Sequence, residues 1–146
     1  MPVELEMALR ILLAAALGGV IGFQRERLDK PAGFRTHILI AAGAALFTVV
    51  SIMGFESDDT ARVAAGIVAG IGFLGAGSII RRGNHVEGLT TAATIWAVAG
   101  IGMAAGTGLY IISVIAAVIF MAVLLLPRLP ANHREDNQTE KIDDTG

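Results

Sequence analysis

Residues 62–77 form an apolar segment that is long enough to cross a bilayer and unusually rich in glycine. A single helix in lipid needs apolar residues but no glycine, so this content indicates that backbones approach each other closely. Charged residues bracket the segment on both sides. The chain is therefore expected to fold as a bundle of closely packed membrane helices. The glycines are Gly66, Gly70, Gly72, Gly75 and Gly77.

The rest of the chain has the same character. Of the 146 residues, 54% are hydrophobic and 16% are charged, whereas soluble domains carry about 25% charged residues. The sequence predicts an all-α polytopic membrane protein, a bundle of five transmembrane helices. Residues 1–127 are expected to form this transmembrane domain, and residues 128–146 are expected to form a short, polar, disordered cytoplasmic tail. The expected spans are Glu6–Phe23, Thr36–Met53, Val63–Ile80, Thr90–Ala105 and Gly108–Leu126.

Lysine and arginine gather on one side of the predicted membrane, and only Arg10 and Arg62 lie on the other. Since cytoplasmic loops carry the excess of positive residues, the N-terminus is expected outside and the C-terminus in the cytoplasm. The positive residues on the cytoplasmic side are Arg25, Arg27, Lys30, Arg35, Arg81, Arg82, Arg128, Arg134 and Lys141.

Three pairs of glycines are spaced four residues apart within the predicted spans. Such pairs mark faces where apolar helices pack closely. Their spacing leaves open whether the faces meet inside one chain or between copies in a homo-oligomer. A leucine at Gly70 or Gly75 is expected to force packed backbones apart. The pairs are Gly18 with Gly22, Gly66 with Gly70, and Gly102 with Gly106.

Asp59 and Arg62 lie three residues apart at the outer mouth of the third span, so a helix places them on one face. One interpretation is an exposed helix cap with a surface ion pair. The other is a pair that attracts or gates cations at a pore mouth. Asp58 and Asp59 offer oxygen ligands that Mg²⁺ accepts, but two adjacent carboxylates need further ligands to form a metal site.

Two other polar regions carry candidate residues. The first cytoplasmic loop is expected to set the topology and contact anionic headgroups, with a partner-docking or anion-binding surface as the alternative. His37 is either an ordinary boundary residue or a group that titrates near neutral pH. The threonines that open the fourth span either bond back to backbone carbonyls or line a polar path. The candidates are Glu26, Arg35, Thr36, His37, Thr90, Thr91 and Thr94.

Three expectations concern single elements. Arg10 is expected to extend to the outer membrane surface. Trp96 lies two turns inside the fourth span, so it is expected to pack inside the bundle. Residues 81–88 are expected to form a tight cytoplasmic turn.

Several function classes do not fit the sequence. The net charge of −2 and the lack of a basic patch with interleaved aromatics argue against nucleic-acid binding. The chain has no cysteine, which rules out disulfides and thiolate metal ligands. It has no catalytic triad, zinc-protease or phosphate-loop motif, so neither an enzyme nor a cofactor is expected. The scarcity of charge deep in the spans argues against a proton-coupled transporter.

Six stretches carry a family resemblance, and they extend over about residues 8–127. In this order they resemble the membrane domain of the MgtC/SapB family. Members are bacterial inner-membrane proteins linked to growth at low Mg²⁺, to virulence and to inhibition of the ATP synthase. The stretches are Leu17–Glu26, Pro31–Leu39, Gly43–Phe47, Arg62–Ala65, Gly70–Gly77 and Gly88–Trp96.

The resemblance implies a multi-pass inner-membrane protein that regulates ion (Mg²⁺) or energy homeostasis. Its partners would be the lipid bilayer and membrane proteins such as the ATP synthase. The alternative is a small transporter or channel for Mg²⁺ or another ion. This chain has Gln24, Gly66 and Ala105 where the family commonly has Glu, Gln and Cys. These differences weaken a shared ligand site. The resemblance carries functional roles over to Glu26, Arg35, Thr36, His37, Asp59, Arg62 and Gly88–Thr94.

Overall fold

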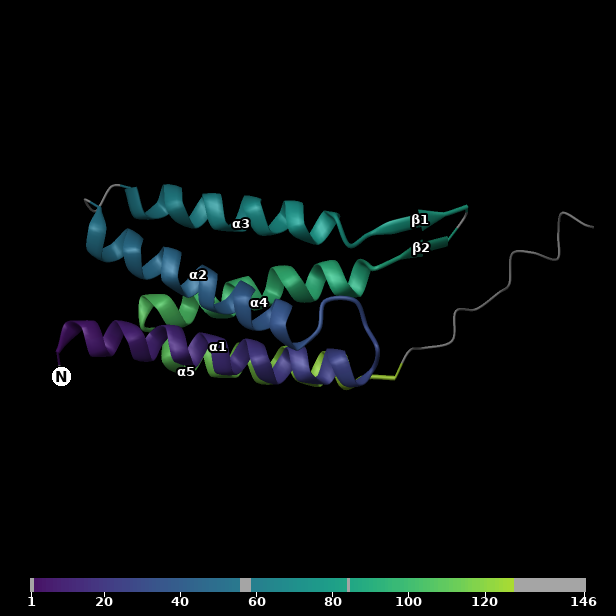
Figure 1. Ribbon diagram of the computed structural model, residues 1–146, viewed down its shortest axis with the longest axis horizontal. Coiled ribbons are helices and arrows are strands. Elements are labelled where there is room, and N and C mark those ends of the chain that lie inside the picture. The colour runs from purple at the N-terminus through teal and green to yellow at the C-terminus, as the bar shows by residue number, and fades with distance from the viewer. Residues whose placement is uncertain (1, 56–58, 84, 128–146) are drawn as a thin grey trace, which may run out of the picture.

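The structure is a computed structural model that describes residues 2–55, 59–83 and 85–127. The described residues form five helices and one two-stranded antiparallel sheet. The helices lie side by side along the long axis of the molecule, with α3 at one edge (Figure 1). In chain order the elements are α1 (Val3–Arg27), α2 (Phe34–Gly54), α3 (Thr60–Ala76), β1 (Ile80–Arg82), β2 (His85–Glu87), α4 (Leu89–Thr107) and α5 (Tyr110–Leu125).

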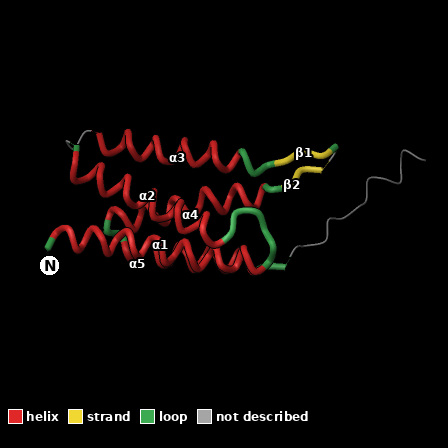
Figure 2. Tube along the Cα trace, viewed as in Figure 1, coloured by secondary structure: helices red, strands yellow, loops and turns green. Residues whose placement is uncertain are grey.

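The two ends of the bundle hold different parts of the chain. The N-terminal end holds the start of α1, the end of α2 and the start of α3 (Figure 1). The hairpin end holds the sheet, which projects beyond the helices (Figure 2). The loop between α1 and α2 also lies at the hairpin end. The predicted tail and Asp58 lie outside the described residues.

Three helices, α1, α2 and α4, are long enough and apolar enough to cross a membrane, and the chain is a membrane protein. The remaining two are apolar but shorter, at 17 residues for α3 and 16 for α5. All five predicted segments are helical. The helix ends differ most from the predicted ones in α1, which continues through Arg25 to Arg27, and in α3, which ends at Ala76.

The connection between α3 and α4 differs from the prediction. The third helix ends at Ala76 and not at Ile80, and Ser78 donates a 2.7 Å hydrogen bond to the Gly75 carbonyl just beyond the last turn. Ile80 then pairs with Glu87 in a β-hairpin that replaces the expected tight turn. Gly88 joins this hairpin to α4 with a φ of 88°, a conformation that glycine adopts without strain.

Close backbone packing joins α1, α2 and α4. A Cβ on Gly18 would lie 2.6 Å from the His37 carbonyl oxygen, and one on Gly106 would lie 2.8 Å from the Ala45 carbonyl oxygen. Real Cβ atoms do not approach that closely, so only glycine fits at these contacts. Gly22 and Gly102 are equally crowded by backbone atoms of α2 or of the turn before it. The core they enclose is centred on Ala14, Ile21, Ala41, Ala45, Val98, Ile101 and Ala105.

The glycines of α3 are placed differently. Among the described residues of this helix only Gly75 is buried, and a Cβ there would meet the Ala92 carbonyl oxygen at 3.3 Å. Gly77 faces only the preceding turn of its own helix. At Gly66, Gly70 and Gly72 a Cβ would have no described atom within 4 Å. Within this chain a leucine at Gly70 therefore has room, and the expectation that it forces backbones apart does not hold there.

Candidate functional site

The ion pair at the start of α3 lies on the surface. Arg62 Nη1 is 3.3 Å from Asp59 Oδ1, and the two side chains are 84% and 53% exposed. Asp59 occupies the N-cap position, but its side chain makes no capping hydrogen bond. Both residues line a shallow depression with Phe55 and Val63, which we call the charged mouth. Its geometry is that of an exposed ion pair, since neither charge is drawn into the bundle.

The described residues contain no cluster of three or more histidine, aspartate or glutamate side chains that would hold a metal ion. Asp58, the candidate ligand next to Asp59 in sequence, lies outside the described residues. Because Mg²⁺ requires several oxygen ligands in octahedral geometry, the described part of the mouth does not by itself make a magnesium site.

A second pocket, of about 310 Å³, lies behind this mouth between α2, α3 and α4. Thr48, Ser51, Thr60 and Thr107 line it, and we call it the hydroxyl pocket. The Thr48 hydroxyl donates to the Ala44 carbonyl at 2.8 Å. The Ser51 hydroxyl is buried and has no hydrogen-bond partner among the described residues. Sequence reasoning missed this pocket, because its lining residues are spread over three helices.

A larger depression, of about 610 Å³, runs along α2 and α3. Its walls are apolar, and we call it the apolar groove. The open glycines of α3, Gly66 and Gly70, lie along it. The groove exists because small residues on α3 leave the side of α2 uncovered. Its lining residues also include Leu39, Ile40, Gly43, Ala44, Phe47, Val63 and Leu74.

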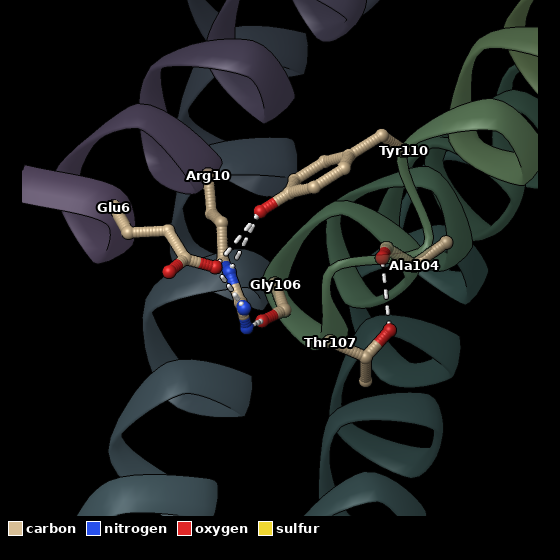
Figure 3. A network of polar contacts seen from close by, with 6 residues as sticks. All are labelled: Glu6, Arg10, Ala104, Gly106, Thr107 and Tyr110. Atoms are coloured by element: carbon tan, nitrogen blue, oxygen red, sulfur yellow. Dashed lines mark hydrogen bonds and ion pairs between the residues drawn. The ribbon is translucent and has the colours of Figure 1, made fainter. Parts of the chain in front are cut away.

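Arg10 belongs to a polar network at the N-terminal end (Figure 3). It bonds to the Glu6 carboxylate at 2.6 Å, to the Gly106 carbonyl at 3.0 Å and to the Tyr110 hydroxyl at 3.1 Å. The side chain therefore turns toward the junction of α4 and α5. The expectation that it extends to the membrane surface is wrong. Three acceptors surround the guanidinium there. They are the Glu6 carboxylate, one turn earlier on α1, and the Gly106 carbonyl and Tyr110 hydroxyl at the junction. This network ties the start of α1 to the α4–α5 junction.

At the opposite end Arg25 is buried between helices, although the sequence placed it in a loop. Its Nη2 donates to the Thr91 hydroxyl at 2.5 Å. Thr94 instead bonds back to the Thr90 carbonyl at 2.6 Å, and Thr90 itself is exposed. The two alternatives predicted for the threonines thus apply to different residues. The Thr94 hydroxyl bonds to a backbone carbonyl of its own helix, and the Thr91 hydroxyl contacts the buried Arg25 side chain.

The candidate residues of the first cytoplasmic loop fall into two groups, those that contact the junction of α1 and α2 and those that are exposed. His37 is fully buried, its Nδ1 lies 2.9 Å from the Gly33 carbonyl oxygen, and its Nε2 has no hydrogen-bond partner among the described residues. Glu26 accepts a 2.7 Å hydrogen bond from the Phe34 amide at the start of α2. Arg35 and Thr36 are exposed on the first turn of α2. Only His37 and Glu26 therefore take part in the packing of α1 on α2.

Trp96 lies on the outside of α4 with 55% of its surface exposed, so the expectation that it packs inside the bundle is wrong. Helix α4 turns its small and β-branched residues inward, where α2 approaches closely at Gly102. An indole has no room on that side.

Comparison with known proteins settles the family. A model of the MgtC family matches residues 11–131. The chain belongs to the MgtC family. Over 127 residues it is 44% identical to the protein named "Putative magnesium transporter YhiD" of Escherichia coli strain K12, covering 82% of this chain and 59% of that protein.

Two further MgtC-family relatives are similar. The chain is 46% identical over 120 residues to Protein MgtC of Salmonella typhimurium strain LT2, covering 82% of this chain and 52% of the relative. It is 48% identical over 115 residues to Protein MgtC of Brucella abortus, covering 79% and 48%. The chain thus spans between about half and three fifths of the length of these relatives. No solved structure matches it significantly.

Proposed function

We propose that this MgtC-family chain regulates Mg²⁺ or energy homeostasis by binding another protein within the bacterial inner membrane. The YhiD relative is named for magnesium transport, which supports the link to Mg²⁺. The family resemblance implies the ATP synthase as one such partner. The observation that carries the proposal is the outward side of α3, which presents small residues that the chain does not use for its own packing.

This surface, here called the outer stripe, consists of Ala65, Ala69, Gly72 and Ala76, all of them exposed. Spacings of three and four residues place them on one side of the helix. Small residues let a second membrane helix approach closely, as they do where α1 and α4 meet α2 in this chain. No described atom lies within 4 Å of a Cβ built at Gly72. The stripe is thus open to a helix of a partner.

The proposed function also includes the topology. All five helices would cross the membrane, with the N-terminal end outside and the hairpin end in the cytoplasm. The arginines of the hairpin, Arg81 and Arg82, lie at the same end as Arg27 and Lys30 (Figure 1). This distribution supports the orientation because cytoplasmic segments carry the positive excess. In this proposed orientation the charged mouth would lie at the outer surface.

The experiment replaces Gly72 with leucine and compares it with Gly100→Leu. Gly100 is an exposed glycine of α4 that also has no described atom within 4 Å of its Cβ position. Each variant is crosslinked in native membranes, and the proteins that copurify are identified. Growth of the cells is followed at low Mg²⁺. Gly72→Leu is expected to lose the partner and the growth phenotype, whereas Gly100→Leu keeps both. Loss in both variants, or in neither, would contradict the proposal.

Transport is the alternative function, and polar groups at both ends of the bundle favour it. Thr48 and Ser51 lie toward the N-terminal end, and Arg25 and His37 lie toward the hairpin end. Other buried side chains of the bundle, those of Ile40, Val98 and Ile101, are apolar and belong to its hydrophobic core. Flux of Mg²⁺ into proteoliposomes distinguishes the two functions. A flux that Asp59→Ala abolishes would overturn a function that consists of regulation alone.

A further inference from the structure

The apolar groove, the hydroxyl pocket and the charged mouth are parts of one crevice between α2 and α3. Val63 lines all three of them. On α2, the lining residues of the groove run up to Phe47 and those of the hydroxyl pocket begin at Thr48. The mouth follows at Phe55. The lining of the crevice therefore changes along its length from apolar to hydroxyl-bearing to charged.

The apolar part of the crevice has the length and the lining that suit a hydrocarbon chain. Between Val63 and Leu74 the groove follows about 16 Å of α3, at 1.5 Å per residue. The groove has a volume of about 610 Å³, and its lining residues are all apolar. Hydrocarbon chains fit this space. They also cover Gly66 and Gly70, which the chain leaves open.

The hydroxyl pocket supplies a polar group that lacks a partner. Ser51 is 2% exposed, and its hydroxyl makes no hydrogen bond to any described residue. Burying a hydroxyl without a partner is unfavourable, so a ligand oxygen that accepts a hydrogen bond from Ser51 would be stabilised in this pocket. The Thr48 and Thr107 hydroxyls are already committed as donors to backbone carbonyls, each at 2.8 Å. The buried Ser51 hydroxyl is thus a donor that is available for an acceptor on the ligand.

The charged mouth offers one charge of each sign. The Asp59 carboxylate accepts hydrogen bonds from an ammonium group, and the Arg62 guanidinium binds a phosphate. Both side chains are more than half exposed, so a headgroup reaches them without displacing any packed side chain. A ligand with both a cation and a phosphate complements this pair. A purely anionic headgroup would leave Asp59 without a partner.

We propose that this crevice binds one phospholipid with a zwitterionic headgroup, of which phosphatidylethanolamine is the type. The acyl chain lies in the apolar groove, and an ester oxygen accepts a hydrogen bond from Ser51. The ammonium meets Asp59 and the phosphate meets Arg62. The site faces away from the outer stripe, because Gly70 and Gly72 are two residues apart on α3 and point in nearly opposite directions. It depends on a membrane-embedded α3 but not on the proposed partner.

The test measures lipid binding to the purified full chain. Native mass spectrometry measures the lipid that is bound after incubation with vesicles that contain either phosphatidylethanolamine or phosphatidylglycerol. Gly70→Leu fills the groove and is expected to weaken phosphatidylethanolamine binding by about tenfold, or 1.4 kcal/mol. Gly72→Leu, on the same helix outside the groove, is the matched control and is expected to bind as the parent chain does. Circular dichroism verifies that each variant is folded.

Two further variants test the polar contacts. Ser51→Ala is expected to weaken phosphatidylethanolamine binding several-fold without altering helix content. Asp59→Asn is expected to remove the preference for phosphatidylethanolamine over phosphatidylglycerol. Equal binding of the two lipids by the parent chain would overturn the proposal. An unchanged lipid affinity in both Gly70→Leu and Ser51→Ala would also overturn it. So would the finding that Gly70→Leu keeps its bound lipid but no longer binds a helix of a partner protein.

Discussion

The buried Arg25 guanidinium of α1 donates a hydrogen bond of 2.5 Å to the hydroxyl of Thr91 on α4. The two residues are 66 positions apart in sequence, and 4% and 3% of their surfaces are exposed. A charged donor in such an environment is costly when its acceptor is removed. This bond therefore holds the hairpin ends of α1 and α4 together.

Replacing Thr91 with valine tests that role. Valine keeps the shape of the side chain but removes the acceptor, so the free energy of unfolding is expected to fall by about 1–3 kcal/mol. The measurement is reversible unfolding in detergent. Thr90→Val, at the exposed neighbouring position, is the control and is expected to change stability by less than about 0.5 kcal/mol. Equal losses in the two variants would mean that the hydrogen bond contributes nothing specific.

The glycines separate into two groups that leucine substitution distinguishes. Gly18→Leu drives a side chain into the His37 carbonyl oxygen and the Ala41 side chain, so it is expected to cost about 3 kcal/mol or more. Gly66→Leu enters the open groove and is expected to leave the folded chain intact. Thermal unfolding and gel filtration of both variants provide the comparison. Destabilisation of Gly66→Leu as large as that of Gly18→Leu would contradict the placement of α3.

The network around Arg10 predicts a graded response at Tyr110. Tyr110→Phe removes the hydroxyl but retains the ring beneath the guanidinium, whose central carbon lies 5.9 Å from the ring centroid. We expect a loss of about 0.5–1.5 kcal/mol from the missing hydrogen bonds. Tyr110→Leu also removes the cation–π contact and is expected to cost about 0.5–1 kcal/mol more. Unfolding measurements in detergent that rank the two variants in the opposite order would show that the ring contributes nothing.

The ion pair of Asp59 and Arg62 is predicted to matter little for stability. Its side chains are exposed, and exposed pairs contribute about 0–1 kcal/mol. Asp59→Ala and Arg62→Ala are therefore expected to unfold within about 1 kcal/mol of the parent chain. A double-mutant cycle measures the coupling of the pair. A coupling well above about 1 kcal/mol would show that the pair is structural, which would leave it less free to bind a headgroup.

The five helices were predictable because each is a run of apolar residues of roughly membrane length. The hairpin was not, because Ile79 and Ile80 continue the apolar pattern of α3 and hide its end at Ala76. Only the pairing of Ile80 with Glu87 reveals the strand. The local spacing of residues carries no information about that pairing.

The candidate site was predictable only in part. Asp59 and Arg62 lie within one helical turn, so their pairing follows from spacing. The burial of Arg25 was missed because positive residues near a membrane boundary are expected in loops. One indication was present: Arg25 follows Gly18 and Ile21 at intervals that keep it on the same helix face. The hydroxyl pocket joins three helices, and no local pattern predicts it.

The proposed function requires that the outer stripe of α3 contacts another membrane protein. A photoreactive amino acid placed at position 72, with position 100 of α4 as the control, tests it directly in native membranes. Residue 72 is expected to crosslink to a distinct membrane protein, and residue 100 is not. Crosslinks from residue 72 to lipid alone, or only to a second copy of this chain, would contradict it.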